Sequence, residues 1–312
     1  MGAQATAGPT NVGYLLSVAA GVLWATTVLF GRLLVDAGVD PLMISAVRAT
    51  LAFAILGGAH LVSRRRPSPS GRTDLGLFAL SGLCLALNFT LFFVCLEHTS
   101  GAIAVSLLYT YPGIVALLAA TFLGERLTGM KVLALAMALT GCFLASQGYD
   151  PEVLRLNLPG ILAGLGAALA LAGYHVMAKV AVGRCDSSTV VLRSFGFAAL
   201  YLLVYQAGDL PVLLALPARA WGGLILLAVF PTFLAYWLFV RALSYIEVSR
   251  ATLACSVEPA AAAILAWLLL GERTGFLQWL GVALITAGVV LIRLSETVRR
   301  NDAGANRGAP AS

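Results

Sequence analysis

The sequence predicts an all-α membrane protein in which ten transmembrane helices form two inverted five-helix repeats. Hydrophobic residues make up 60% of the 312 residues and charged residues only 11%, whereas soluble domains contain roughly 45–50% and about 25%. Apolar runs of about twenty residues recur along the chain, and a helix of that length crosses a hydrocarbon core of roughly 30 Å. The third observation is a duplication, because segment 248–273 repeats the pattern of segment 101–126.

The apolar runs give the boundaries of the helices. In chain order, helices are expected at about 12–35, 41–63, 74–96, 99–123, 128–147, 158–181, 187–207, 217–244, 248–271 and 274–294. The first five helices form one repeat, 12–147, and the last five form a second, 157–295. The flanking segments 1–11 and 296–312 are small and polar in composition, so disordered tails are expected there.

Basic residues in the loops predict the orientation in the membrane. The cluster that decides it lies between the second and third helices and between the fourth and fifth: Arg64, Arg65, Arg66, Arg72, Arg126 and Lys131. Cytoplasmic loops carry an excess of Lys and Arg, so this side and both termini are expected to be cytoplasmic, with the chain in the inner (plasma) membrane. This orientation also accounts for the formal net charge of +6 without a nucleic-acid partner.

Two features recur in the fourth helix of each repeat, at positions 147 residues apart. They are a proline, Pro112 and Pro259, and a Gly-Glu-Arg end, 124–126 and 271–273. Because five helices are an odd number, consecutive copies must cross the membrane in opposite senses. Inverted repeats commonly place a substrate site near the midplane between the halves, where it opens alternately to either side.

These paired motifs resemble the EamA-type family of the drug/metabolite transporter superfamily. The resemblance covers about residues 12–295 and rests on the proline and the Gly-Glu-Arg end of each repeat. It implies a ten-helix transporter of the kind that exports amino acids, aromatic ones among them, and related metabolites. The first repeat has Tyr111 where the second has Glu258, so a role for the acid is not duplicated.

Glu258 is the principal candidate site residue. An acidic side chain at the centre of a transmembrane helix costs about 2.5–3.5 kcal/mol on insertion, so it usually faces protein or a water-filled cavity. The proline that follows removes a backbone hydrogen bond and loosens the helix at this point. Glu258 is therefore expected to bind substrate or carry a coupling proton; the alternative is a structural acid bonded to a neighbouring helix.

Polar and aromatic residues at similar depth are candidates for the wall of a substrate cavity. A tyrosine or tryptophan ring offers area for stacking, and its O–H or N–H offers a hydrogen bond. The candidates are Tyr109, Tyr111, Asn88, Trp24, Tyr174, His175, Tyr236 and Trp237. For each of them, packing between helices is the competing interpretation.

Two further pairs are expected to be structural or gating residues. Pro112 and Pro259 interrupt equivalent helices and would absorb a change of shape. Arg48 and Arg193 lie near the beginnings of the second and seventh helices, and their long stems would let the guanidinium groups reach opposite membrane faces. They are interpreted as anchors.

The function that these features favour is secondary transport: export of amino acids or related small metabolites by alternating access. Neither a nucleotide-binding motif nor a hydrolase motif is found. The five cysteines show no metal-ligand spacing, so neither a metal nor a cofactor is expected. Multidrug or nucleoside efflux, an intramembrane lipid-processing enzyme that uses Glu258 and His175, and a structural or receptor-like subunit remain alternatives. The oligomeric state is open, with a monomer acceptable.

Overall fold

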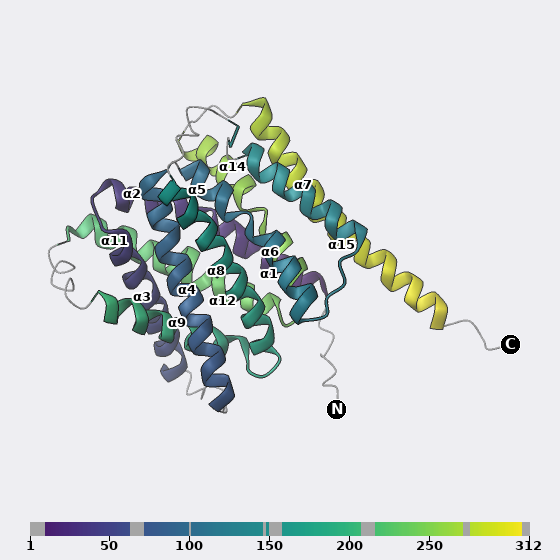
Figure 1. The fold of residues 1–312 in the computed structure, drawn as a ribbon, viewed down its shortest axis with the longest axis horizontal. Coiled ribbons are helices and arrows are strands. Elements are labelled where there is room, and N and C mark those ends of the chain that lie inside the picture. The colour runs from purple at the N-terminus through teal and green to yellow at the C-terminus, as the bar shows by residue number, and fades with distance from the viewer. Residues whose placement is uncertain are drawn as a thin grey trace.

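The computed structural model is a bundle of helices (Figure 1). It describes residues 10–62, 72–99, 101–145, 148–149, 158–206, 216–270 and 275–307, and within these residues every regular element is helical. Eight helical stretches are long and apolar enough to cross a membrane, and two shorter apolar helices, Gly129–Ala145 and Phe276–Ile292, complete the set. The expected all-α membrane fold is therefore confirmed, with helical structure at each of the ten expected positions.

The elements of the first half follow the expected order. They are α1 (Thr10–Trp24), α2 (Thr26–Asp36), α3 (Pro41–Val62), α4 (Arg72–His98), α5 (Gly101–Leu108), α6 (Tyr111–Phe122) and α7 (Gly129–Ala145). The second half contains α8 (Leu158–Val182), α9 (Ser187–Tyr205), α11 (Ala218–Leu227), the π-helix η1 (Ala228–Leu234), α12 (Ala235–Ala242), α13 (Val248–Cys255), α14 (Glu258–Leu270) and α15 (Phe276–Arg307).

The fourth helix of each repeat is broken at the same place. The first pair, α5 and α6, is separated by Tyr109–Thr110, and the second pair, α13 and α14, by Ser256–Val257, which are 147 residues further on. In both cases proline is the second residue of the following helix. Proline is tolerated in a first turn because its missing N–H would have no partner there. The prolines thus mark the breaks, as the sequence predicted.

Two other interruptions were not expected from the sequence. The first helix divides into α1 and α2 at Ala25, and the eighth contains the π-helix η1 around Pro231. Proline cannot donate to the carbonyl four residues earlier, and here the hydroxyl of Thr232 donates to that carbonyl, on Leu227, at 2.7 Å. The π-helix therefore accommodates a proline within a membrane helix without leaving the Leu227 carbonyl unbonded.

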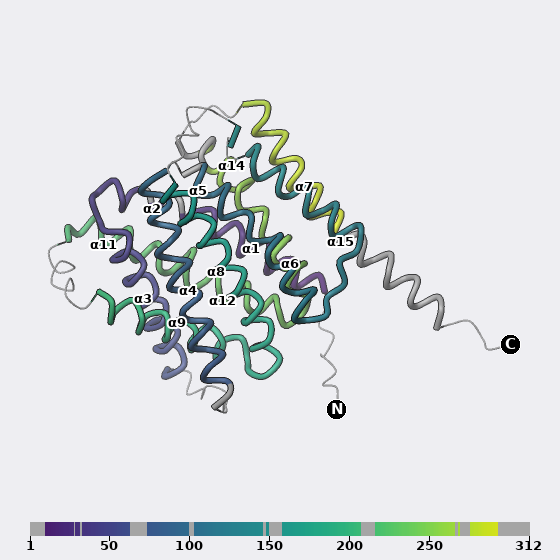
Figure 2. The backbone as a smooth tube through the Cα atoms, in the orientation of Figure 1, coloured from purple at the N-terminus to yellow at the C-terminus, as the bar shows by residue number. Residues whose placement is uncertain are grey.

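Helices of the two halves pack in matching pairs. The third helix, α4, packs on α8, and the equivalent part of the eighth, α12, packs on α1. The fifth and tenth helices, α7 and α15, run side by side (Figure 2). A Cβ on Gly141 would lie 2.8 Å from the carbonyl oxygen of Gly281, so glycine is required where these two helices cross.

The C-terminal boundary differs from the expected one. A tail was expected from residue 296, whereas α15 continues to Arg307. Neither glycine nor proline occurs between Ile292 and Ala303, and the Glu and Arg residues in this stretch favour a helix. The remainder of the expected tails, 1–9 and 308–312, lies outside the described residues.

Candidate functional site

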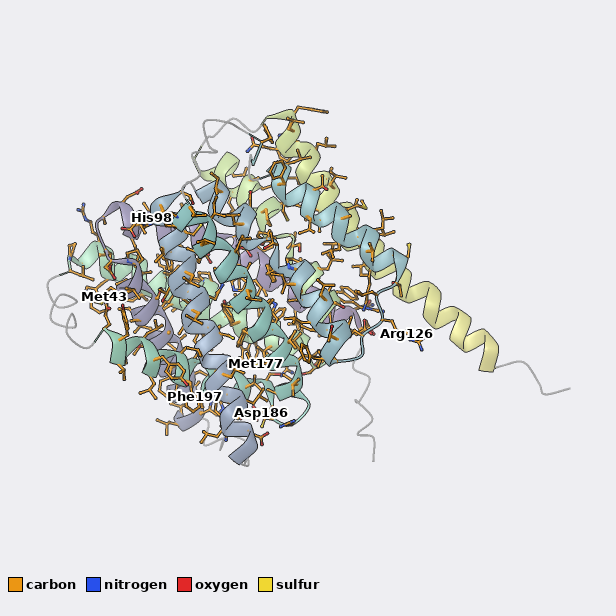
Figure 3. The ribbon with its side chains drawn as sticks, viewed as in Figure 1. Met43, His98, Arg126, Met177, Asp186 and Phe197 are labelled. Carbon is orange, nitrogen blue, oxygen red and sulfur yellow. The ribbon has the colours of Figure 1, made fainter. Side chains whose placement is uncertain are left out.

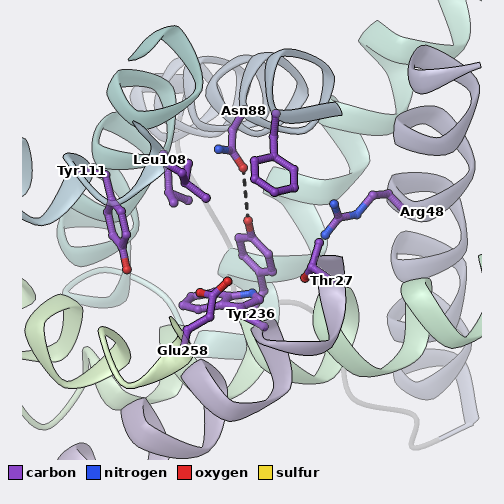
Figure 4. A pocket seen from close by; sticks show the side chains of 10 residues that line it. Thr27, Arg48, Asn88, Leu108, Tyr111, Tyr236 and Glu258 are labelled. Carbon is purple, nitrogen blue, oxygen red and sulfur yellow. Dashed lines mark hydrogen bonds between the residues drawn. The ribbon is translucent and has the colours of Figure 1, made fainter. Parts of the chain in front are cut away.

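A buried cavity of about 40 Å³ lies between the two halves (Figure 4). Its polar lining consists of Thr27, Arg48, Asn88, Tyr111, Tyr236 and Glu258. Its apolar lining consists of Trp24, Phe92, Leu108 and Leu171. The cavity is thus bounded by residues beside three of the helix interruptions described above: those after α1, after α5 and before α14.

Glu258 lines the cavity as the first residue of α14 and is only 9% exposed. A carboxylate is favoured at the N-terminus of a helix because the unbonded N–H groups give that end a partial positive charge. Within the described residues, no basic nitrogen lies within the 4.0 Å of an ion pair with Glu258. Tyr109 is close enough to interact with this carboxylate, although its hydroxyl makes no hydrogen bond of standard geometry.

Arg48 also lines the cavity, which corrects its interpretation as a surface anchor. The side chain is 2% exposed, and Nε donates to Oγ1 of Thr232 at 2.9 Å. The guanidinium carbon lies 4.1 Å from the ring centre of Phe89 and 5.6 Å from that of Phe93, within the range of cation–π attraction. These contacts across the helix bundle hold the arginine inside rather than letting it reach the membrane surface.

The repeat counterpart, Arg193, has a different position. It lies on α9, is partly buried, and its guanidinium carbon is 5.2 Å from the ring centre of Phe78. It does not line the cavity. The two arginines that the sequence paired therefore have different surroundings, and only Arg48 contributes charge to the site.

Asn88 and Tyr236 line the same cavity. Nδ2 of Asn88 donates to the carbonyl of Ala167 at 3.0 Å, which fixes the orientation of the amide. The remaining amide oxygen faces Tyr236, whose hydroxyl donates to it at 3.5 Å (Figure 4). The ring of Tyr236 packs edge-on against Trp24 at a centroid distance of 5.1 Å.

His175 and Tyr174 do not line the cavity; they lie behind its wall with Tyr109 and are completely buried. The ring of His175 stacks on that of Phe239 with 4.0 Å between the ring centres, and its Nδ1 is 3.2 Å from Oγ1 of Thr252. Within the described part of the chain, five polar atoms in or behind the cavity wall have no hydrogen-bond partner: the hydroxyls of Tyr109, Tyr111 and Tyr174, Nε2 of His175 and Nε1 of Trp24. Trp24 and Tyr111 are the two of these residues that also line the cavity.

Trp237, a candidate from the sequence, does not line this cavity. Its indole nitrogen donates to the hydroxyl of Ser188 on α9 at 3.3 Å, and the guanidinium carbon of Arg241 lies 5.8 Å from the centre of its ring.

Pro112 lines a second, smaller cavity of about 20 Å³ together with Lys131 and Ser249.

A network of charged residues joins the halves at the N-terminal end of α13, ten residues before Glu258 in the chain. Glu125, from the first Gly-Glu-Arg end, accepts hydrogen bonds from the backbone N–H of Val248 at 2.9 Å and from the hydroxyl of Ser249. Lys131 lies 3.4 Å from Glu125 and 2.7 Å from Glu247, which also pairs with Arg250 at 2.7 Å. We call Glu125, Lys131, Glu247, Ser249 and Arg250 the charged network.

In the sequence, Glu125 stood out only as part of the repeated Gly-Glu-Arg end. The sequence did not indicate Thr232, which orients Arg48, or the partners of Glu125. The available signals were Pro231 within an apolar run, and Glu247 with Arg250 three positions later. Arg126, exposed beside the charged network, and His98, at the end of α4, lie on opposite sides of the molecule (Figure 3).

Comparison with known proteins shows the same two-part organisation. The EamA-like transporter family matches residues 11–147 and again residues 158–294. The uncharacterized transporter YwfM of Bacillus subtilis is 27% identical over 90% of this chain and 94% of its own length. A probable terminal-alkyne amino-acid exporter of Streptantibioticus cattleyicolor is 27% identical over 90% of this chain and 93% of its own. A solved crystal structure has the same fold, with a TM-score of 0.72 at 20% identity over 91% of this chain and 97% of that one.

Proposed function

Because the chain belongs to the EamA-like transporter family, we propose that this transporter exports amino acids or related small metabolites across the inner membrane by alternating access. The curated relatives are described as transporters rather than enzymes. One of them is a probable amino-acid exporter, and another is an uncharacterized inner membrane transporter, YicL of Salmonella typhimurium, 26% identical over 94% of this chain and 98% of its own.

The observation that carries the proposal is the cavity with Glu258 and Arg48 in its wall. Charged side chains at membrane depth are costly, and they commonly mark the path of a solute or ion. Both charges here face one space between the halves, beside the breaks of α5–α6 and α13–α14. A packing role alone would not require a shared polar space at this depth.

The small size of the cavity supports a mechanism in which the halves move. About 40 Å³ has room for water but not for an amino acid. A solute therefore enters only when helices separate on one side. Broken helices can absorb such changes with limited rearrangement, and equivalent breaks in an inverted pair of repeats would open the two sides in turn.

The test is counterflow in proteoliposomes that contain only this protein. Amino acids, nucleosides and cationic drugs are offered as labelled solutes, and uptake is compared with that of protein-free liposomes. Exchange of amino acids supports the proposal. Exchange of nucleosides or drugs alone would replace the substrate class, and no exchange of any solute would contradict transport by this chain alone.

A further inference from the structure

Arg48 and Glu258 carry opposite charges in one cavity, yet they do not pair with each other. Their charges are near enough to interact, but among the described residues neither forms an ion pair within 4.0 Å. Buried charges are stabilised only when they are paired and hydrogen-bonded, and a charge left without a direct partner is costly. A ligand that carries one group of each charge would meet Arg48 and Glu258 at once.

The chemistry of Arg48 determines which group of a ligand would bind to it. Nε is occupied by Thr232, and Phe89 covers one face of the guanidinium plane at 4.1 Å. The donors that remain lie on the terminal nitrogens, at the edge of a planar fork. A planar fork held by its inner nitrogen and its face matches a carboxylate, which can accept two parallel hydrogen bonds.

The chemistry of Glu258 determines which second group of the ligand would bind there. A carboxylate accepts hydrogen bonds and attracts a cation, and an ammonium group offers three donors. Asn88 and Tyr236 line the same cavity and offer neutral hydrogen-bonding groups. Trp24, Phe92 and Leu108 provide the apolar remainder of the wall.

We propose that the cavity, when helices separate and enlarge it, binds an α-amino acid as its zwitterion, with the substrate carboxylate on Arg48, its ammonium on Glu258 and its side chain against the apolar wall. This assignment rests on the proposed transport function and makes Arg48 a specificity-determining residue. Amines without a carboxylate leave Arg48 unpaired, and acids without an amine leave Glu258 unpaired. Both classes are therefore excluded by the same pair of charges.

The experiment measures binding separately from transport, through the ligand-induced shift in thermal unfolding of the purified protein. The probes are L-leucine and L-phenylalanine, each compared with its amide, which lacks the carboxylate, and with its N-acetyl derivative, which lacks the ammonium. We expect a free amino acid to bind at least about tenfold more tightly than either derivative, because each derivative leaves a buried charge unpaired. Equal binding of an amino acid and its amide, or no binding of either amino acid, would overturn the proposal without any variant.

Two variants then test which of the two residues binds the carboxylate of the amino acid and which binds its ammonium. Arg48→Gln should reduce the preference for the free amino acid over its amide to about onefold, and Glu258→Gln should do the same for the N-acetyl derivative. Arg193→Gln is the matched control, because Arg193 is the repeat counterpart outside the cavity, and it should keep the wild-type preferences. An Arg48→Gln protein that still prefers the acid over the amide would overturn the role of Arg48. Equal counterflow rates for an amino acid and its amide would overturn the proposed zwitterion site, but they would not contradict the proposed transport function.

Discussion

At the scale of single residues, Thr232 connects a backbone irregularity to a charge. Its hydroxyl donates to the Leu227 carbonyl and accepts from Nε of Arg48. Both partners are buried, so neither can exchange this bond for one with water. Thr232 is itself completely buried.

We therefore expect Thr232→Val, which keeps the shape and removes the hydroxyl, to destabilise the protein by about 2–4 kcal/mol. The cost arises because a carbonyl and a buried cation each lose a partner. Thermal unfolding of the purified protein measures it. Thr232→Ser retains the hydroxyl and should unfold close to the wild-type temperature; a Thr232→Val protein as stable as the wild type would contradict the assignment.

Glu247 provides a pH dependence outside the membrane-spanning segments. Burial alone would raise the pKa of this carboxyl, but hydrogen bonds and charges from Lys131 and Arg250 together hold the pKa below its usual value. A lowered folded-state pKa means that the stabilisation is present above about pH 4.5 and is lost as the pH falls through the lower, folded-state value. Acid should therefore weaken this part of the charged network.

The corresponding measurement compares the unfolding temperature of wild type and Glu247→Gln at pH 7 and at pH 4. We expect the wild type to be more stable at pH 7 and the difference to shrink at pH 4. Asp186→Asn, which changes an acid that caps α9 rather than one in the charged network, is the control. An equal difference for Glu247→Gln at both pH values would show that its ionisation does not contribute.

Glu258 could be predicted from the sequence and Arg48 could not, for a physical reason. An acid within an apolar run is costly wherever it faces lipid, so its burial follows from local sequence alone. An arginine seven residues into a helix can either reach the surface or turn inward. The choice depends on Thr232, which is 184 positions away, and on Phe89, so only the tertiary structure decides it.

At the scale of elements, the two proline-marked breaks are equivalent and both lie beside the cavity. Pro112 and Pro259 are each the second residue of a helix. An alanine in place of Pro112 would supply an N–H that can bond the carbonyl of Leu108, and one in place of Pro259 could bond that of Cys255. Each replacement would favour one continuous helix across the break.

We expect Pro112→Ala and Pro259→Ala to slow counterflow by at least about threefold while the unfolding temperature changes by only a few degrees, because continuity stiffens the hinge without removing packing. Pro217→Ala, at the exposed start of α11, is the control. Unchanged exchange rates for both variants at equal protein density would show that the breaks are structural only.

The sequence predicted these breaks because proline leaves a local signal in both copies. It did not predict the division of α1 and α2 at Ala25, where neither proline nor glycine occurs. This interruption lies next to Trp24, which contacts Tyr236 and Phe239. Contacts from distant helices therefore decide its position, and no local pattern could reveal it.

At the scale of the whole molecule, the expected topology places the α2–α3 connection outside and the α6–α7 connection inside. Ala37 and Arg126 are exposed residues of these connections. Cysteines introduced at these positions should react with a membrane-impermeant reagent from opposite sides: Ala37→Cys in intact cells, and Arg126→Cys only after permeabilisation. The five native cysteines are buried or half-buried, and unmodified protein serves as the control. Labelling of both from one side would contradict the ten-helix topology.

The charged network contains a difference between the two repeats. At the positions 147 residues before Val248 and Ser249 the chain has Gly101 and Ala102, so the first repeat has no serine equivalent to the one that bonds Glu125. Under the alternating access proposed above, the bond between Ser249 and Glu125 would form at one entrance and would have no serine equivalent at the other. The two orientations of the empty carrier would for that reason differ in free energy, and the carrier would spend unequal times facing the two compartments. A protein built from two copies of one unit can in this way treat its two sides as chemically distinct.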